Sequence, residues 1–266
     1  SEPPLQTPTE FLLVDSAKLS GSSGNVISLG NWLEFAEPEL LSFMMASYKQ
    51  NTAINFDLHS NKFFLLADRY DKAEQAYFEK EEKKDKREKQ LTEIYKYSQV
   101  KEVPEKMPVQ LNYSNAAMIV QTFPNKSLNE LIEILHTNEW IQRKTLSSFD
   151  KEKLTKRLGL AKNWLEKYAP EDVKFTVQEE VPEGLKLNSK EKDALKLVAE
   201  TLNKKEWEQK KLFEEFYSIC EKVGIKNTDF FKAAYNVLLN KDRGPKLAPF
   251  ILTLGKEKVV ELFEKV

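Results

Sequence analysis

Apolar side chains recur at helical spacing through most of this 266-residue chain, and this pattern constrains the fold more than any other feature of the sequence. The clearest stripe has members three or four positions apart: Phe63, Leu66, Tyr70, Ala73 and Tyr77. This spacing places side chains on one face of a helix, where they pack against other helices. The chain from Asn61 onward is therefore expected to be almost entirely helical.

The first 60 residues have a mixed pattern. A short apolar run at 11–14 and an alternating run at 54–58 are typical of strands. Between them, apolar residues over 32–48 return to helical spacing, and Pro38 either breaks that helix or begins a second one. These features predict a small α/β region at residues 1–60.

Capping signals mark the ends of several helices. Ser127 with Glu130 three residues later is typical of a capping box. A further helix is expected to open with Ser148 or Asp150 as its N-cap, and Ala169-Pro170 is expected to end it. A later helix carries Phe213, Phe216, Tyr217, Cys220 and Val223, and Gly224 is expected to stop it.

Residues 174–188 form the best candidate for a domain boundary, since Pro182 and Gly184 interrupt the helical pattern there. The sequence thus predicts a mainly α fold, in which a small α/β region precedes two helical bundle domains. The expected domains are residues 1–60, 61–184 and 185–266.

Composition excludes several classes of protein. The chain has 41 Lys and Arg against 42 Asp and Glu, so any surface for nucleic acid must come from local segregation of charge. A single cysteine, Cys220, excludes an internal disulfide framework and is expected to be buried. His59 and His136 are far apart, so no metal site is expected. No apolar run has the length of a membrane span and no signal peptide is visible, which predicts a cytoplasmic protein without a membrane.

Basic residues gather on one side of the expected helix after residue 148. At about 100° per residue, one flank carries Lys153, Lys156, Arg157 and Lys167 together with Trp164. A basic flank with an aromatic residue suits a phosphate backbone. The alternative is a solvated face with the tryptophan tucked under it.

Two of the eight glycines lie in one short loop, Lys18-Leu-Ser20-Gly21-Ser22-Ser23-Gly24-Asn25. Glycine allows backbone N–H groups to converge on an anion, serine hydroxyls add donors, and lysine adds a charge. These residues suit a phosphate-binding loop, although a flexible turn between two strands has the same composition. The loop is not a Walker loop, because no Gly-Lys-Ser/Thr follows at the required spacing.

The order of residues in this loop resembles the second signature loop of class I aminoacyl-tRNA synthetases, in the variant found in class I lysyl-tRNA synthetases. Ser23 departs from the pattern, which usually has lysine there. Three other segments are similar to the same family and follow in family order: residues 37–40, 161–175 and 243–250. The resemblance implies that Lys18 is catalytic and that Lys18, Ser20, Gly21 and Ser22 bind the phosphates of ATP.

The resemblance implies a lysine–tRNA ligase, which forms lysyl-adenylate from lysine and Mg²⁺-bound ATP and transfers lysine to its tRNA. This chain is similar to the tRNA-binding C-terminal half, so the half that binds lysine and adenine is expected to be missing and the chain alone to be inactive. Contacts to tRNA are expected from Lys153, Lys156, Arg157, Lys167 and Arg243.

The last bundle is expected to read the anticodon, with stacking from exposed members of a set of four aromatic residues: Trp207, Tyr217, Tyr235 and Phe250. A monomer is expected. The alternatives are a non-catalytic tRNA-binding module derived from this family and a helical scaffold for a protein partner.

Overall fold

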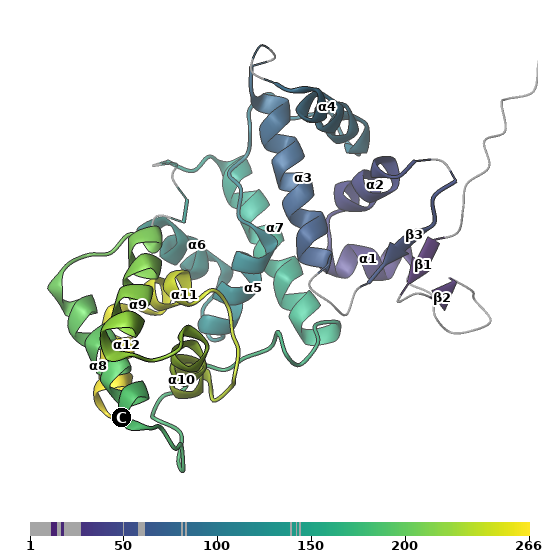
Figure 1. Cartoon of the computed structure of the whole chain (residues 1–266). Helices are drawn as coiled ribbons and strands as arrows, with labels where there is room; N and C mark the ends of the chain where they lie inside the picture. Colours follow the sequence, from purple (N-terminus) through teal and green to yellow (C-terminus); the bar gives the residue numbers. More distant parts are fainter. Residues whose placement is uncertain are drawn as a thin grey trace, which may run out of the picture. The chain divides into compact units, whose positions relative to one another are not determined.

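The computed structural model describes residues 12–14, 17–18, 28–49, 51–57, 62–80, 82, 84–138, 140–141, 143 and 145–266. These residues form twelve helices and three short strands, so the prediction of a mainly helical fold is confirmed (Figure 1). The chain divides into two compact units. Unit 1 comprises Ser1–Ala117 and Ser127–Pro170, and unit 2 comprises Met118–Lys126 and Glu171–Val266.

The N-terminal part of unit 1 contains the strands. Strand β1 (Leu12–Val14) lies between β2 (Ala17–Lys18) and β3 (Ile54–Phe56); it is antiparallel to β2 and parallel to β3. Helices α1 (Leu29–Phe35) and α2 (Pro38–Ser47) lie between β2 and β3 in the sequence. Pro38 occupies the first turn of α2, where its missing N–H costs nothing, so it begins a second helix.

Five further helices begin in unit 1. They are α3 (Lys62–Phe78), α4 (Lys86–Ser98), α5 (Tyr113–Thr122), α6 (Leu128–Thr137) and α7 (Ser148–Lys167). Helix α5 is shared between the units, which divide after Ala117. In the core, the Phe63 ring of the expected α3 stripe lies 4.6 Å from Tyr113 and 5.8 Å from Trp164, measured between ring centroids.

Capping decides where the helices of unit 1 begin. The capping box of Ser127 and Glu130 is present at α6, as the sequence predicts. The N-cap of α7 is Ser147, not Ser148 or Asp150. Asp150 occupies the third helical position instead and completes a second capping box, because its carboxylate accepts from the backbone N–H of Ser147.

Unit 2 consists mainly of the helices coloured green to yellow in Figure 1. They are α8 (Ser189–Lys204), α9 (Gln209–Val223), α10 (Asn227–Leu239), α11 (Leu247–Leu254) and α12 (Lys256–Glu264). Gly224 ends α9 in a left-handed conformation with φ of 70°, as expected for a helix C-terminus. Cys220 is buried, as predicted.

Unit 2 includes the segment after Glu171, which contacts the helices that follow it, while the expected domain bounds at residues 60 and 184 stay a prediction. The Phe175 ring lies 5.5 Å from the Phe250 ring, and the backbone N–H of Gln178 donates to the Leu238 carbonyl at 2.9 Å. The Lys241 ammonium donates to the carbonyls of Glu171 and Lys174. These contacts tie residues 171–178 to the helices that follow, and the backbone N–H of Phe175 also donates to Gln121 Oε1 of α5 at 2.8 Å.

Candidate functional site

The signature loop begins in the sequence at Lys18, the last residue of β2. In this strand the backbone of Lys18 pairs with that of Leu13 in β1. The Lys18 side chain and the residues Ser20, Gly21 and Ser22 lie outside the described residues, so their role with ATP stays a prediction. One ammonium, two hydroxyls and a glycine backbone are donors whose chemistry fits a phosphate group.

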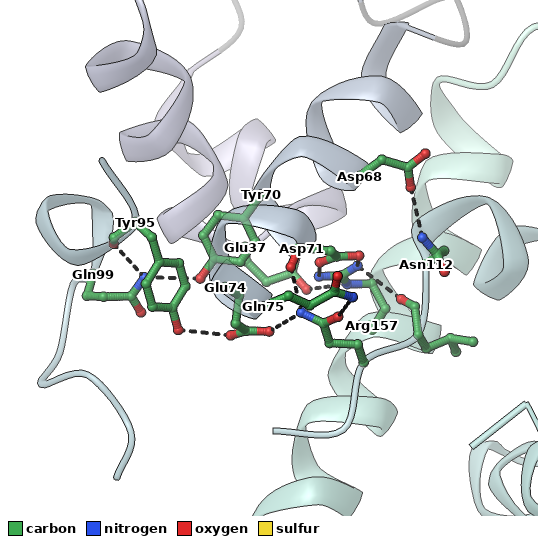
Figure 2. A network of polar contacts seen from close by, with 12 residues as sticks. Glu37, Asp68, Tyr70, Asp71, Glu74, Gln75, Tyr95, Gln99, Asn112 and Arg157 are labelled. Atoms are coloured by element: carbon green, nitrogen blue, oxygen red, sulfur yellow. Dashed lines mark hydrogen bonds and ion pairs between the residues drawn. The ribbon is translucent and has the colours of Figure 1, made fainter. Parts of the chain in front are cut away.

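Arg157 lies in a buried network of polar contacts, drawn in Figure 2. Its Nε donates to Glu37 Oε1 at 2.7 Å, and its two terminal nitrogens each contact an oxygen of Asp71 at 3.3 Å. Nη1 also donates to the Leu111 carbonyl at 3.1 Å. The network thus joins α7 to the start of α2, to α3 and to the segment before α5.

This position corrects the expectation that Arg157 belongs to an exposed basic flank. Its side chain is only 12% exposed and both of its carboxylate partners are buried. Trp164, on the same expected flank, is fully buried as well. A guanidinium that already has carboxylate partners on both sides is not available to an RNA phosphate, so Arg157 is a structural residue.

Burial and charge act against each other within the network. Burial raises the pKa of the Asp71 carboxyl to about 6, although the Arg157 charge lowers it. Burial also raises the pKa of Glu37, but attraction and hydrogen bonding to Arg157 outweigh it and leave that pKa below its usual value. One guanidinium faces two carboxylates, so one of them remains incompletely neutralised, and Asp71 is the group that takes up a proton most readily.

A small cavity of about 40 Å³ lies beside these groups, lined by Glu37, Asp71 and Arg157 among others. Oε2 of Glu37 is buried and has no hydrogen-bond partner among the described residues. A polar cavity of this size accommodates a water molecule, which would satisfy that oxygen. The cavity is therefore part of the structural network.

A second group of contacts extends the network to α4. Glu74 accepts from the Tyr95 hydroxyl at 2.9 Å and from the Gln110 side-chain amide at 2.8 Å. Gln99 donates to the Tyr70 hydroxyl at 3.2 Å, and burial raises the pKa of both tyrosines above the ordinary value. These contacts fix α3 against α4 and provide no group that could act as a nucleophile.

The remaining basic residues of α7 have different surroundings. Lys156 is exposed and has no ion pair with any described residue, whereas Lys153 is half-buried with its Nζ 5.6 Å from the Phe149 ring. Lys167 forms an ion pair with Glu34 at 2.7 Å. Lys153 and Lys156 are thus more available to a phosphate than Lys167, and the tRNA role of all three stays a prediction.

A cleft of about 500 Å³ was not anticipated from the sequence. Arg69 and Lys72 of α3 and Arg87 of α4 line it, together with Glu79, Asp85 and Glu88. The positive and negative charges balance, so the cleft has no strong preference for an anion. The sequence signal was weak, because the charged run at 79–89 resembles any solvated connection.

The described residues contain neither a metal-binding cluster nor a membrane-spanning helix. Within them, no group of three or more His, Cys, Asp and Glu side chains is arranged to hold a metal ion. No helix in the part of the chain that the structure describes is long and apolar enough to cross a membrane.

Arg243 is exposed on a turn of unit 2 that is fixed on both sides. Before it, the Lys241 ammonium donates to the carbonyls of Glu171 and Lys174. After it, the Tyr235 hydroxyl donates to the carbonyl of Pro245. The turn therefore presents the Arg243 side chain to solvent from a constrained backbone, as a binding residue requires.

The four aromatic candidates in unit 2 divide clearly. Phe250 is fully buried, Tyr235 is engaged by Pro245, and Trp207 donates from its indole nitrogen to the Thr201 carbonyl. Of the four residues, only Tyr217 is classed as exposed, at 37%. Phe213, from the same expected helical stripe, is also exposed rather than part of the core.

Comparison with known proteins identifies the family. The family model described as class I tRNA synthetases (K) matches residues 1–101, and the model described as an anticodon binding domain matches residues 144–265. The lysine–tRNA ligase of Thermococcus kodakarensis is 35% identical over 97% of this chain and 49% of its own length. Those of Pyrococcus horikoshii and Borreliella burgdorferi are 34% and 32% identical, over 98% and 99% of this chain and 49% of each relative.

The chain spans about half the length of the curated relatives it matches. Two family models follow one another along it, and the relatives align over nearly all of it. The chain therefore belongs to the class I lysyl-tRNA synthetase family and corresponds to its C-terminal portion, which carries the anticodon-binding domain.

Proposed function

We infer that this chain supplies the tRNA-binding surfaces and the signature loop of a lysine–tRNA ligase that uses ATP, lysine and a lysine-accepting tRNA. The observation that supports this most directly is the match of residues 144–265 to an anticodon binding domain in a chain whose relatives are lysine–tRNA ligases. We propose that this ligase acts in the cytoplasm.

The signature loop would act during activation of lysine. ATP with Mg²⁺ supplies the adenylyl group, and Lys18 would stabilise negative charge that develops as pyrophosphate leaves, while Ser20, Gly21 and Ser22 hold the phosphates. Loss of one such electrostatic contact typically lowers a rate by about 10²–10³-fold.

In a complete enzyme that contains this chain, Lys18→Ala should therefore lower the rate of adenylate formation far more than it weakens ATP binding. Lysine-dependent pyrophosphate exchange measures the rate, and Lys49→Ala, at an exposed lysine outside the loop, is the control. An unchanged rate in the Lys18 variant would make that residue structural.

The purified chain alone should not form lysyl-adenylate. A loop that grips phosphates cannot by itself orient lysine and the α-phosphate for reaction, and that orientation accounts for much of the rate. The test is pyrophosphate exchange with the isolated chain. Clear turnover would contradict the assignment of the activation site to another part of the enzyme.

Lys153 and Lys156 of α7 are proposed to contact tRNA phosphates. Replacing Lys153 and Lys156 with alanine should reduce affinity for tRNA and should lower the slope of log K against log salt by about 1 for each lost contact. Lys162→Ala is a matched control, because this exposed lysine lies on the opposite side of the same helix. Filter binding at several salt concentrations measures both quantities, and a flat salt response of the wild type would favour a protein partner instead.

Arg243 is proposed to contact the anticodon loop. Arg243→Ala should weaken binding of a hairpin with the U-rich lysine anticodon by about 1–3 kcal/mol, by analogy with base-edge contacts in grooves. The exposed neighbour Lys246 provides the control variant Lys246→Ala. Equal binding of hairpins with and without the anticodon uridines would show that anticodon reading does not reside in this chain.

A further inference from the structure

Helices α9 and α10 carry a cluster of aromatic side chains at the surface of unit 2. Phe213 and Tyr217 of α9 are 44% and 37% exposed, and their ring centroids are 5.0 Å apart with an interplanar angle of 75°. Phe231 of α10 lies 6.4 Å from Phe213 and 6.2 Å from Tyr217. Single exposed apolar residues are common on protein surfaces, but a cluster of exposed aromatic rings is typical of a binding site.

Buried rings support this cluster from below. Phe216 and Phe230 are fully buried with their centroids 5.5 Å apart, and Phe216 also packs edge-on against Phe231 at 6.3 Å. The exposed rings therefore rest on a packed aromatic layer that joins the two helices. Such a platform loses little conformational entropy when a flat ligand stacks on it.

The size of the surface favours an unpaired nucleobase as its occupant. The exposed parts of Phe213 and Tyr217 amount to less than about 200 Å². A stable contact between two copies of a chain needs roughly 800 Å² on each partner. Lys210 lies on the same face of α9, three residues before Phe213, and has no ion pair with any described residue. Its charge suits a phosphate beside a stacked base, although Glu214 and Glu221 of the same helix carry the opposite charge.

We propose that Phe213, Tyr217 and Phe231 form a stacking platform for an unpaired base of the anticodon loop of tRNA. This inference rests on the proposed function and adds the residues that hold the base. Aromatic side chains are the usual partners of splayed-out bases in single-stranded RNA, because every base presents a flat face to them. The platform lies within the region that matches an anticodon binding domain.

The test uses the whole chain and an anticodon stem-loop hairpin with 2-aminopurine in place of one loop base. Phe213→Leu and Tyr217→Leu keep apolar bulk on the helix but remove the ring, whereas Tyr217→Phe keeps the ring. Each leucine variant should raise Kd roughly 5- to 100-fold and weaken the quenching of 2-aminopurine, and Tyr217→Phe should bind like the wild type. Tyr97→Leu, at an exposed tyrosine of α4 in unit 1, is the control.

Two failures are distinguishable. If the wild-type chain binds neither the hairpin nor whole tRNA, the proposed function fails and the platform with it. If the wild type binds the hairpin and both leucine variants bind within about 2-fold of it, the platform is refuted while the proposed function stands. The platform would also be refuted if the wild type sediments as a dimer and both leucine variants sediment as monomers, because the rings would then join two copies of the chain. Circular dichroism establishes that each variant is folded before binding is compared.

Discussion

Replacing Arg157 with methionine should destabilise unit 1 strongly. Methionine keeps most of the apolar stem but leaves the carboxylates of Glu37 and Asp71 buried without their cation. Removing one partner of a buried ion pair costs about 3–5 kcal/mol. The 2.7 Å contact with Glu37 is short, whereas both contacts with Asp71 are long at 3.3 Å, so we expect a value near the lower limit, about 3 kcal/mol.

The assay is thermal unfolding followed by tryptophan fluorescence. Trp32 and Trp164 are both buried in unit 1, so the signal reports largely on that unit. For a domain of this size, 1 kcal/mol shifts Tm by about 2–4 °C, so the expected loss is roughly 6–12 °C. Lys156→Met, at the exposed neighbouring position, should change Tm by less than about 2 °C. An Arg157→Met variant that melts within that same limit would refute the argument that the network is a structural lock.

The pH dependence provides an independent check of the same reasoning. The pKa of Asp71 is raised to about 6 by burial, so the folded state binds this proton more tightly than the unfolded state does. The free energy of unfolding therefore falls as pH rises from about 4 to about 6, and Asp71→Asn should remove that slope. In Arg157→Met both carboxylates lose their cation, so the destabilisation should be smaller at pH 5 than at pH 8. Equal destabilisation at the two pH values would contradict unpaired carboxylates as the cause.

Three further predictions concern single residues. Four hydrogen bonds to the Asp150 carboxylate outweigh its burial and lower its pKa to about 2. Asp150→Asn should therefore lower the free energy of unfolding by roughly 2 kcal/mol at pH 7 and by progressively less from pH 4 to pH 2, measured by urea unfolding. Burial raises the pKa of the Cys220 thiol to about 11, so it should react with a thiol reagent only after denaturation; rapid reaction of the native chain would contradict its burial. A Cβ at Gly244 would lie 2.7 Å from a Leu239 methyl and 2.8 Å from the Tyr235 ring. Gly244→Ala should therefore destabilise unit 2 by about 1–3 kcal/mol, measured by thermal unfolding, whereas an unchanged Tm would show that the turn adapts.

The sequence by itself determined most of the helices and the family. The stripe that begins at Phe63, the capping box of Ser127 and Glu130, and the stop at Gly224 all depend on residues within a few positions of one another. Such short-range rules operate before any tertiary contact forms and can be read along the chain. The signature loop after Lys18 is likewise local, and its resemblance to class I lysyl-tRNA synthetases agrees with the family that the comparisons show.

Tertiary structure alone decided which polar and aromatic side chains are free to bind. Arg157 shares a helical flank with Lys156, but its partner Glu37 is 120 positions away in the sequence, and only folding brings the two within 2.7 Å. Phe213 and Phe216 belong to one apolar stripe, yet Phe216 is buried and Phe213 is exposed. Periodicity fixes the face of a helix on which a residue lies but not how far the neighbouring elements cover that face, because coverage depends on contacts between segments distant in sequence.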